Sequence, residues 1–213
     1  MNIDVSAKGA TRTGDCFLQY LPRDVSAGGF GLIYRYHNSI GQGIPSVTEI
    51  IGELLPQWQA DEWYLERGTA VHACCALIAQ GKSFTNDPAI DGQVKAARTW
   101  FRDFKPVVLE WESRYTSERY QYGGTMDLVC KLKGQRVIVD FKASLTETVP
   151  YQLGGYAELV GDVNLGLGVE LKETGEYKVS GFYGLRTYRR AFLALRTVYG
   201  IRAELGMLTK EEE

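Results

Sequence analysis

Two aspartates and a lysine lie close together near the middle of the 213-residue chain, in a pattern that suits metal-dependent phosphate chemistry. Asp127 follows Gly123-Gly124-Thr125-Met126, and Asp140 is followed two residues later by Lys142. Paired carboxylates are hard oxygen ligands, which favour Mg²⁺ or Mn²⁺ and leave positions for water and substrate phosphate. An amine beside such an ion can offset charge on a phosphate ester. These residue types indicate a phosphodiesterase site.

The aspartates are expected to meet because the sequence between them predicts a β-hairpin. The apolar runs 125–132 and 135–142 flank Lys133-Gly134, an X-Gly pair that suits a two-residue turn with positive φ. This register places Asp127 opposite Asp140, with Cβ atoms about 5 Å apart, and Lys142 shares their face. Like charges in such positions destabilise a sheet, and a bound cation would compensate.

Two flanking elements supply further polar residues. A strand over 107–115 carries Glu112, although Glu110 lies two residues earlier on the same face and competes for its role. After the hairpin, Pro150 to Val160 predicts a helix that places Gln152 and Tyr156 four residues apart on one face.

His72 lies in an apolar helix, where a single histidine is more often a hydrogen-bonded core residue than a metal ligand. The preceding Arg67-Gly68-Thr69 raises the case for ligation, because it is similar to the R-G-T-x-x-H element of a nuclease family whose other motifs follow in order. In that element, glycine lets the helix approach the sheet.

The complete set resembles the RecB-like exonuclease branch of the PD-(D/E)XK nucleases. It consists of His72, Glu112, G-x-x-D ending at Asp127, D-x-K at Asp140 and Lys142, and Q-x-x-x-Y at Gln152 and Tyr156. The segment 112–142 is similar in particular to the mitochondrial genome maintenance exonuclease and to small phage exonucleases. The resemblance runs from about residue 46 to 156, and it implies a restriction-endonuclease-like core.

The resemblance also implies a role for each residue. Asp127 and Asp140 would ligate the metal, with the Phe141 carbonyl and His72 as further ligands. Glu112 would bind a metal through water or position the nucleophile.

Lys142 would be the main catalytic group outside the metal: it would orient or help deprotonate the attacking water and offset charge on the phosphorus. Gln152 and Tyr156 would bind a substrate phosphate or hold Lys142 in place. For Tyr156, ordinary packing of the helix on the sheet is an equally good interpretation.

The fold class expected is α/β or α+β, with a central mixed sheet flanked by helices. Ser46-Val47-Thr48-Glu49 is a capping-box pattern that predicts a helix start. Two helices follow, one through His72 and one from Pro88 to Phe104, and they are expected to cover one sheet face. A hairpin around Thr174-Gly175 and a final helix complete the chain.

Length and composition predict one domain over residues 1–213. Its expected parts are an N-terminal polar arm over 1–30, a hairpin from Leu32 into Ile44, a catalytic core over 46–160, and a C-terminal helix with an acidic tail over 185–213. The four cysteines form no CxxC pair, and none follows Cys130, so neither a zinc site nor an iron–sulfur cluster is expected.

Charge and hydropathy bear on partners and location. The net charge of −2 is low for a nucleic-acid-binding protein, although a local cleft can still be positive. The arginines of the C-terminal segment would fit DNA contact or a solvated helix face: Arg186, Arg189, Arg190, Arg196 and Arg202. No signal peptide or membrane span is recognisable, so a cytoplasmic location is expected, in the host cytoplasm if the protein is phage-encoded.

The function expected is a Mg²⁺- or Mn²⁺-dependent deoxyribonuclease. The resemblance favours an exonuclease acting on DNA ends or single strands in recombination, replication or repair, with a recombination or single-strand-binding protein as a candidate partner. A structure- or sequence-directed endonuclease is the alternative, since the same core cuts ends or internal bonds depending on its loops. A catalytically idle nucleic-acid-binding or assembly module is the alternative from another class.

Overall fold

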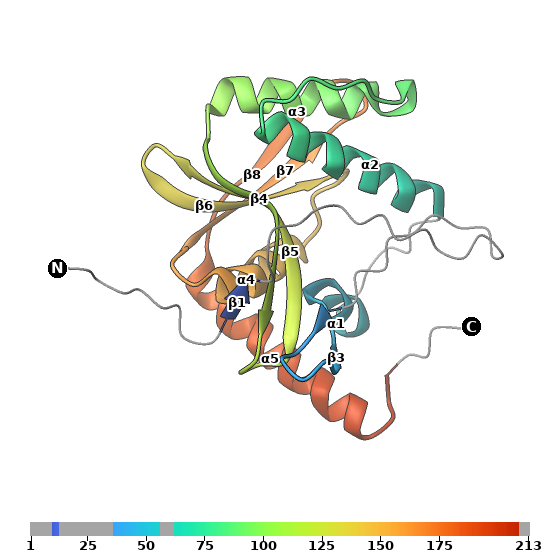
Figure 1. Ribbon diagram of the computed structural model, residues 1–213, viewed down its shortest axis with the longest axis vertical. Helices are drawn as coiled ribbons and strands as arrows, with labels where there is room; N and C mark the ends of the chain where they lie inside the picture. Colours follow the sequence, from blue (N-terminus) through green and yellow to red (C-terminus); the bar gives the residue numbers. More distant parts are fainter. Residues whose placement is uncertain (1–9, 13–35, 56–61, 209–213) are drawn as a thin grey trace.

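A mixed β-sheet with helices on both faces forms the centre of the protein in the computed structural model, which describes residues 10–12, 36–55 and 62–208 (Figure 1). The six strands lie in the order β1 (Ala10–Arg12), β4 (Val107–Ser117), β5 (Tyr122–Leu132), β6 (Gln135–Lys142), β7 (Leu165–Leu171) and β8 (Tyr177–Gly184). Neighbours are antiparallel except β6 and β7, which are parallel. The expected fold class is confirmed.

The predicted hairpin is present between β5 and β6. Leu132 pairs with Gln135, and the two residues between them have positive φ, 49° at Lys133 and 83° at Gly134. Positive φ at both central positions defines the type I′ turn, whose twist matches that of the flanking strands. The turn therefore fixes the register of the hairpin.

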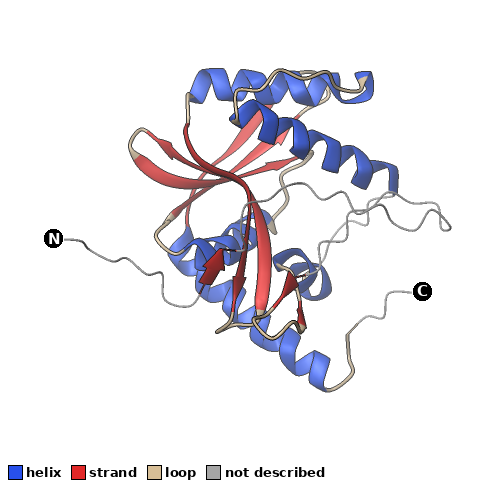
Figure 2. Ribbon diagram, in the orientation of Figure 1, coloured by secondary structure: helices blue, strands red, loops and turns tan. Residues whose placement is uncertain are grey.

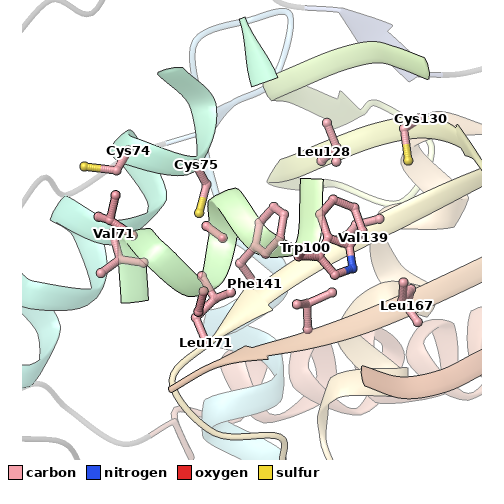
Figure 3. Packing of buried hydrophobic residues seen from close by; sticks show 14 of the residues in the cluster. Val71, Cys74, Cys75, Trp100, Leu128, Cys130, Val139, Phe141, Leu167 and Leu171 are labelled. Atoms are coloured by element: carbon pink, nitrogen blue, oxygen red, sulfur yellow. The ribbon is translucent and has the colours of Figure 1, made fainter. Parts of the chain in front are cut away.

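One face of the sheet is covered by α2 (Glu62–Ala79) and α3 (Asp91–Phe104), with a short 3₁₀ turn (Pro88–Ile90) before α3. Trp100 is fully buried at the centre of this core and packs edge-on against Phe141 of β6 (Figure 3). Strand residues Leu128 and Cys130 point into the same core. The expectation that these two helices share a face is confirmed.

The opposite face is covered by α1 (Val47–Leu54), α4 (Val149–Val160) and α5 (Leu185–Glu204) (Figure 2). At the start of α1, Ser46 Oγ accepts from Glu49 N at 3.0 Å and Glu49 Oε2 accepts from Ser46 N at 2.6 Å, which confirms the capping box. Helix α4 connects the parallel strands β6 and β7, as such a crossover requires.

The sheet extends into the outer parts of the chain on both sides of the expected core. The N-terminal arm contains a strand, since β1 pairs with the end of β4, and no apolar pattern in the sequence signalled it. Strands β7 and β8, which follow the expected catalytic core over 46–160, continue the same sheet. A small hairpin of β2 (Tyr36–His37) and β3 (Gly43–Ile44) is present, whereas Leu32, Cys16 and the acidic tail after residue 208 lie outside the described residues.

The described cysteines Cys74, Cys75 and Cys130 are free and buried. Figure 3 shows the thiols of Cys74 and Cys75 pointing in different directions from α2. In the parts of the chain that the structure describes, no helix has the length and apolar character needed to cross a membrane.

Candidate metal centre at the fork of β5 and β6

The predicted site residues gather where β5 separates from β6, a place we call the fork. The paired register between these strands runs from Leu132 with Gln135 to Leu128 with Val139, and it stops one residue short of Asp127 and Asp140. At that level Asp127 Oδ2 accepts the N–H of Phe141 at 2.8 Å. A side-chain carboxylate thus takes the place of a strand carbonyl, so the expected pairing of Asp127 directly opposite Asp140 in the ladder is wrong.

The strand pair β4–β5 is distorted at the same level. Leu128 faces the α2–α3 core, but Met126, two residues earlier, faces the opposite core, so the usual alternation is broken at Asp127. Glu112 lies across from Asp127 by the register on either side and has φ of 43°, a value that side chains other than glycine rarely adopt. The distortion changes where the carboxylates of both strands point.

Three side chains meet at this distortion: His72 from α2, Glu112 from β4 and Asp127 from β5. One ligand atom of each lies within 4.8 Å of the other two, and His72 Nδ1 lies 2.9 Å from Asp127 Oδ1. Among the described residues, this is the group of histidine, cysteine and carboxylate side chains with metal-ligand spacing. One imidazole nitrogen with two carboxylates is a donor set that suits Mn²⁺ and related divalent ions.

Charges in this group are strongly coupled. Burial, and then the charge of Asp127, raises the pKa of Glu112 to about 7. Burial also opposes the ionised form of Asp127, yet its pKa is lowered because His72, Lys142 and the Phe141 N–H stabilise the carboxylate. The pKa of His72 is raised, since the charge and hydrogen bond of Asp127 outweigh the effect of burial. A proton between His72 and Asp127 therefore occupies a place where a cation would also be stabilised.

The second part of the site is a buried chain of polar contacts around Asp140. Lys142 Nζ lies 3.1 Å from Asp140 Oδ1, and Gln152 Nε2 donates to the same oxygen at 3.2 Å. Gln152 Nε2 also donates to the hydroxyl of Tyr156 at 2.8 Å. Gln152 and Tyr156 are 7% and 5% exposed, so they are placed to hold Asp140 rather than to reach a phosphate in solvent.

One buried oxygen in this chain lacks a hydrogen-bond donor. Lys142 Nζ lies 3.1 Å from Asp140 Oδ2, which is an ion-pair distance, but the direction is not that of a hydrogen bond. Burial raises the pKa of Asp140 to about 6, against the opposing effect of Lys142. The pKa of Lys142 is itself raised, because Asp140 and Asp127 outweigh burial, so this amine stays protonated at neutral pH. An unsatisfied buried carboxylate oxygen is the environment that a cation relieves.

The glycine pair before Asp127 allows two aromatic rings to approach β5. A Cβ on Gly124 would lie 2.8 Å from Tyr156 Cε1, and a Cβ on Gly123 would lie 2.4 Å from the ring of Tyr36. Tyr36 also shares a 2.7 Å hydrogen bond with Thr125 Oγ1. The sequence reasoning missed Tyr36, because the two glycines signal a close approach without indicating which distant residue makes it.

The structure distinguishes Glu110 from Glu112, the two candidates for the site glutamate. Glu110 Oε2 accepts from the hydroxyl of Tyr115 at 2.8 Å, and Glu110 Oε1 lies 3.5 Å from Arg136, so this side chain is engaged away from the fork. Glu112 is the one that lies with His72 and Asp127.

Two other expectations fit the structure poorly. No described atom lies within 4 Å of the position that a Cβ on Gly68 would occupy, so this glycine is not explained by a close approach of α2 to the sheet. Three arginines of α5 serve internal contacts: Arg189 donates to the carbonyls of Gly161 and Val163, Arg196 to that of Gln121, and Arg202 pairs with Glu53 at 2.8 Å.

These residues fit a divalent cation on two grounds: the donor set of His72, Glu112 and Asp127, and the unsatisfied oxygen of Asp140 beside it. Asp140 lies outside the 4.8 Å group but within electrostatic reach of Asp127. No family model matches the chain, and no curated protein is similar enough to count as a match. The function must therefore be argued from the site itself.

Proposed function

We propose that this chain is a Mg²⁺- or Mn²⁺-dependent deoxyribonuclease, and specifically an exonuclease that hydrolyses phosphodiester bonds at DNA ends or in single strands. The observation that carries the proposal is the convergence, at one fork in the sheet, of a ligand group (His72, Glu112 and Asp127) with a buried Asp140–Lys142 pair. Such ligands can hold an ion that activates water and polarises a phosphate, and a nearby lysine can stabilise developing negative charge.

Support also comes from the order of the elements. The resemblance to RecB-like PD-(D/E)XK nucleases implies a restriction-endonuclease-like core, and a sheet of three antiparallel strands followed by a helical crossover to a parallel strand is compatible with it. The same resemblance is the ground for proposing an exonuclease of the phage type, active in recombination, replication or repair.

In this proposal Asp127, Glu112 and His72 would hold the ion, and Asp140 and the Phe141 carbonyl would be further ligands. The ion would polarise the scissile phosphate and lower the pKa of a water molecule. Lys142, which stays protonated, would orient that water and offset charge developing on the phosphate oxygens. A protonated amine does not accept a proton, so electrostatic stabilisation is the role that its raised pKa favours.

Gln152 and Tyr156 act through Asp140. Gln152 donates to Asp140 Oδ1, and the carboxylate in turn fixes the ammonium group of Lys142. Positioning of this kind matters because a misplacement of about 1 Å can cost about 10²-fold in rate. These two residues are therefore assigned to positioning rather than to phosphate binding.

The test is cleavage of end-labelled linear DNA and of circular DNA, single- and double-stranded, with Mg²⁺, Mn²⁺ or EDTA. Lys142→Ala is compared with Lys131→Ala, which alters an exposed lysine on the same hairpin. We expect metal-dependent loss of linear DNA by the wild type and by Lys131→Ala, and loss of this activity in Lys142→Ala.

Other cleavage results would favour one of the two alternative functions. Cutting of closed circles would replace the exonuclease with a structure- or sequence-directed endonuclease. A well-folded wild type that cuts no substrate in any metal would overturn the proposal and favour a binding or assembly module.

A further inference from the structure

Helix α5 presents a stripe of apolar and small side chains to solvent, on the side opposite the core. The buried residues Leu185 and Phe192 define its inner side, against α4 and α1. The stripe recurs on the outer side with spacing that alternates between four and three residues, and it ends at the C-cap: Thr187, Ala191, Ala194, Val198, Ile201 and the C-cap Leu205. That spacing is the heptad pattern by which one helix packs along another.

The exposure of the stripe is greatest in its second half. Val198 is 47% exposed, Ile201 51% and Leu205 67%, and they lie on one helix face within two turns. A contiguous exposed apolar patch on a helix is a feature of interaction surfaces. Figure 1 shows α5 at the edge of the molecule, beside α4.

Side-chain size changes along the stripe in a way that suits an antiparallel copy of the same helix. The first half carries small side chains, at Thr187, Ala191 and Ala194, and the second half carries large ones. If two copies cross antiparallel at residue 196, Ala194 faces Val198 of the second copy, Ala191 faces Ile201 and Thr187 faces Leu205. Each layer then combines one small and one large residue, whereas a parallel pair would leave gaps in one half and crowd the other.

Charge changes along the helix in the same way. Arg190 is exposed beside the first half of the stripe and Glu204 beside the second, both on the flank that also carries Thr197. The register that matches small with large residues places Arg190 of one copy about 3 Å along the helix from the level of Glu204 of the other, on both sides of a two-fold axis at residue 196. Opposite charges at these flanking positions set the orientation of paired helices.

We propose that the partner of this face is a second copy of the chain, bound through antiparallel α5 helices in a two-fold symmetric homodimer. Self-complementary patches of this type produce isologous interfaces, the commonest kind in soluble oligomers. The α5 face is distinct from the fork, and the dimer does not depend on the proposed nuclease activity.

The test is sedimentation equilibrium of the full chain over a range of concentrations, with Ile201→Asp as the disrupting variant and Lys131→Asp as the surface control. We expect a dimer for the wild type and the control. In Ile201→Asp the dissociation constant should rise by more than about 100-fold, because an unpaired charge would lie in the interface. A folded wild type that stays monomeric at the highest concentration overturns the proposal, and a different protein would then be the partner of this face.

Two cysteine variants and a charge exchange test the orientation. Thr197→Cys, one residue from the axis, should form a disulfide-linked dimer when a mild oxidant such as oxidised glutathione removes the two thiol hydrogens, whereas Arg190→Cys should not, because antiparallel copies place that residue about 18 Å from its equivalent. Efficient cross-linking of both variants would indicate a parallel pair and overturn the proposed geometry. Arg190→Glu should weaken the dimer, and adding Glu204→Arg should restore it.

Discussion

Residues 128–131 of β5 pair with β4 on one side and β6 on the other, whereas residues 122–126 pair with β4 alone because β6 diverges. The first segment places Leu128, Val129 and Cys130 in the two apolar cores, and its ladder with β4 is interrupted only by a register shift at residue 109. At the end of the second, a carboxylate accepts a backbone N–H and meets His72 and Glu112. The comparison shows that the same strand supplies stability where its pairing is complete and polar chemistry where the pairing stops.

The largest expected effect comes from removing the charge at the fork. Asp127→Asn keeps the size of the side chain and an oxygen for the Phe141 N–H, but it loses the charge that would hold an ion and pair with His72. We expect the DNA cleavage rate to fall by about 10³-fold or more. Single-turnover kinetics measure the rate, with a thermal melt as the folding control. A rate within tenfold of the wild type would contradict the assignment.

Leu132→Ala tests packing at the turn end of β5, where Leu132 pairs with Gln135 of β6. Leu132 is 4% exposed in the α2–α3 core, so truncation leaves a cavity and should lower the free energy of unfolding by about 2–5 kcal/mol. The cleavage rate per folded molecule should stay within about twofold of the wild type. Urea denaturation and kinetics on the same samples separate the two quantities. Lost activity with unchanged stability would remove the distinction between the segments.

Gly124→Ala tests the contact between residues 122–126 of β5 and Tyr156 of α4. The added Cβ would lie 2.8 Å from Tyr156 Cε1, so the ring must move, and its bond with Gln152 moves with it. We expect a loss of about 1–3 kcal/mol in stability, as for other overpacked sites, together with slower cleavage. Gly52→Ala is the matched control: it has open space, lies in α1, and should gain up to about 1 kcal/mol.

The smallest effect is a pH dependence of ion binding. The raised pKa values of Asp140, about 6, and Glu112, about 7, mean that the metal-free fold holds protons that an ion must displace. The Mn²⁺ dissociation constant should therefore fall as pH rises from 6 to 8, by at most about tenfold per pH unit for each proton released. Glu112→Gln should flatten this dependence, and an unchanged slope in that variant would exclude Glu112 as the titrating ligand.

The same pKa shifts predict the sign of a stability effect. A carboxylate whose pKa is higher in the folded chain than in the unfolded chain stabilises the fold less as it ionises. For Glu112, the usual pKa is 4.5 and the pKa in the fold is about 7, so the stability of the metal-free protein should fall as pH rises from 4.5 towards about 7. Mn²⁺ should offset this loss. Thermal melts across this range, with and without Mn²⁺, provide the check.

Elements with local signals were predictable from the sequence. The type I′ turn at Lys133-Gly134, the capping box at Ser46 and the helix that carries Gln152 all depend on residues within a few positions of each other. The fork was not predictable from local sequence. Beyond the end of the β5–β6 ladder, β5 stays paired with β4, and the carboxylate of Asp127 accepts the N–H of Phe141. The positive φ of Glu112 and the contact of Tyr36 with Gly123 likewise arise from distant residues.

Direct titration of Mn²⁺ into the protein by isothermal calorimetry tests the central claim, that the fork is a divalent-ion site. Three proteins are compared: the wild type, Asp127→Asn, and Glu110→Gln, which alters a carboxylate of β4 engaged with Tyr115 instead of the fork. We predict saturable binding by the wild type and by Glu110→Gln, and its loss in Asp127→Asn. Absence of binding to the folded wild type, or equal binding by all three, would contradict the account.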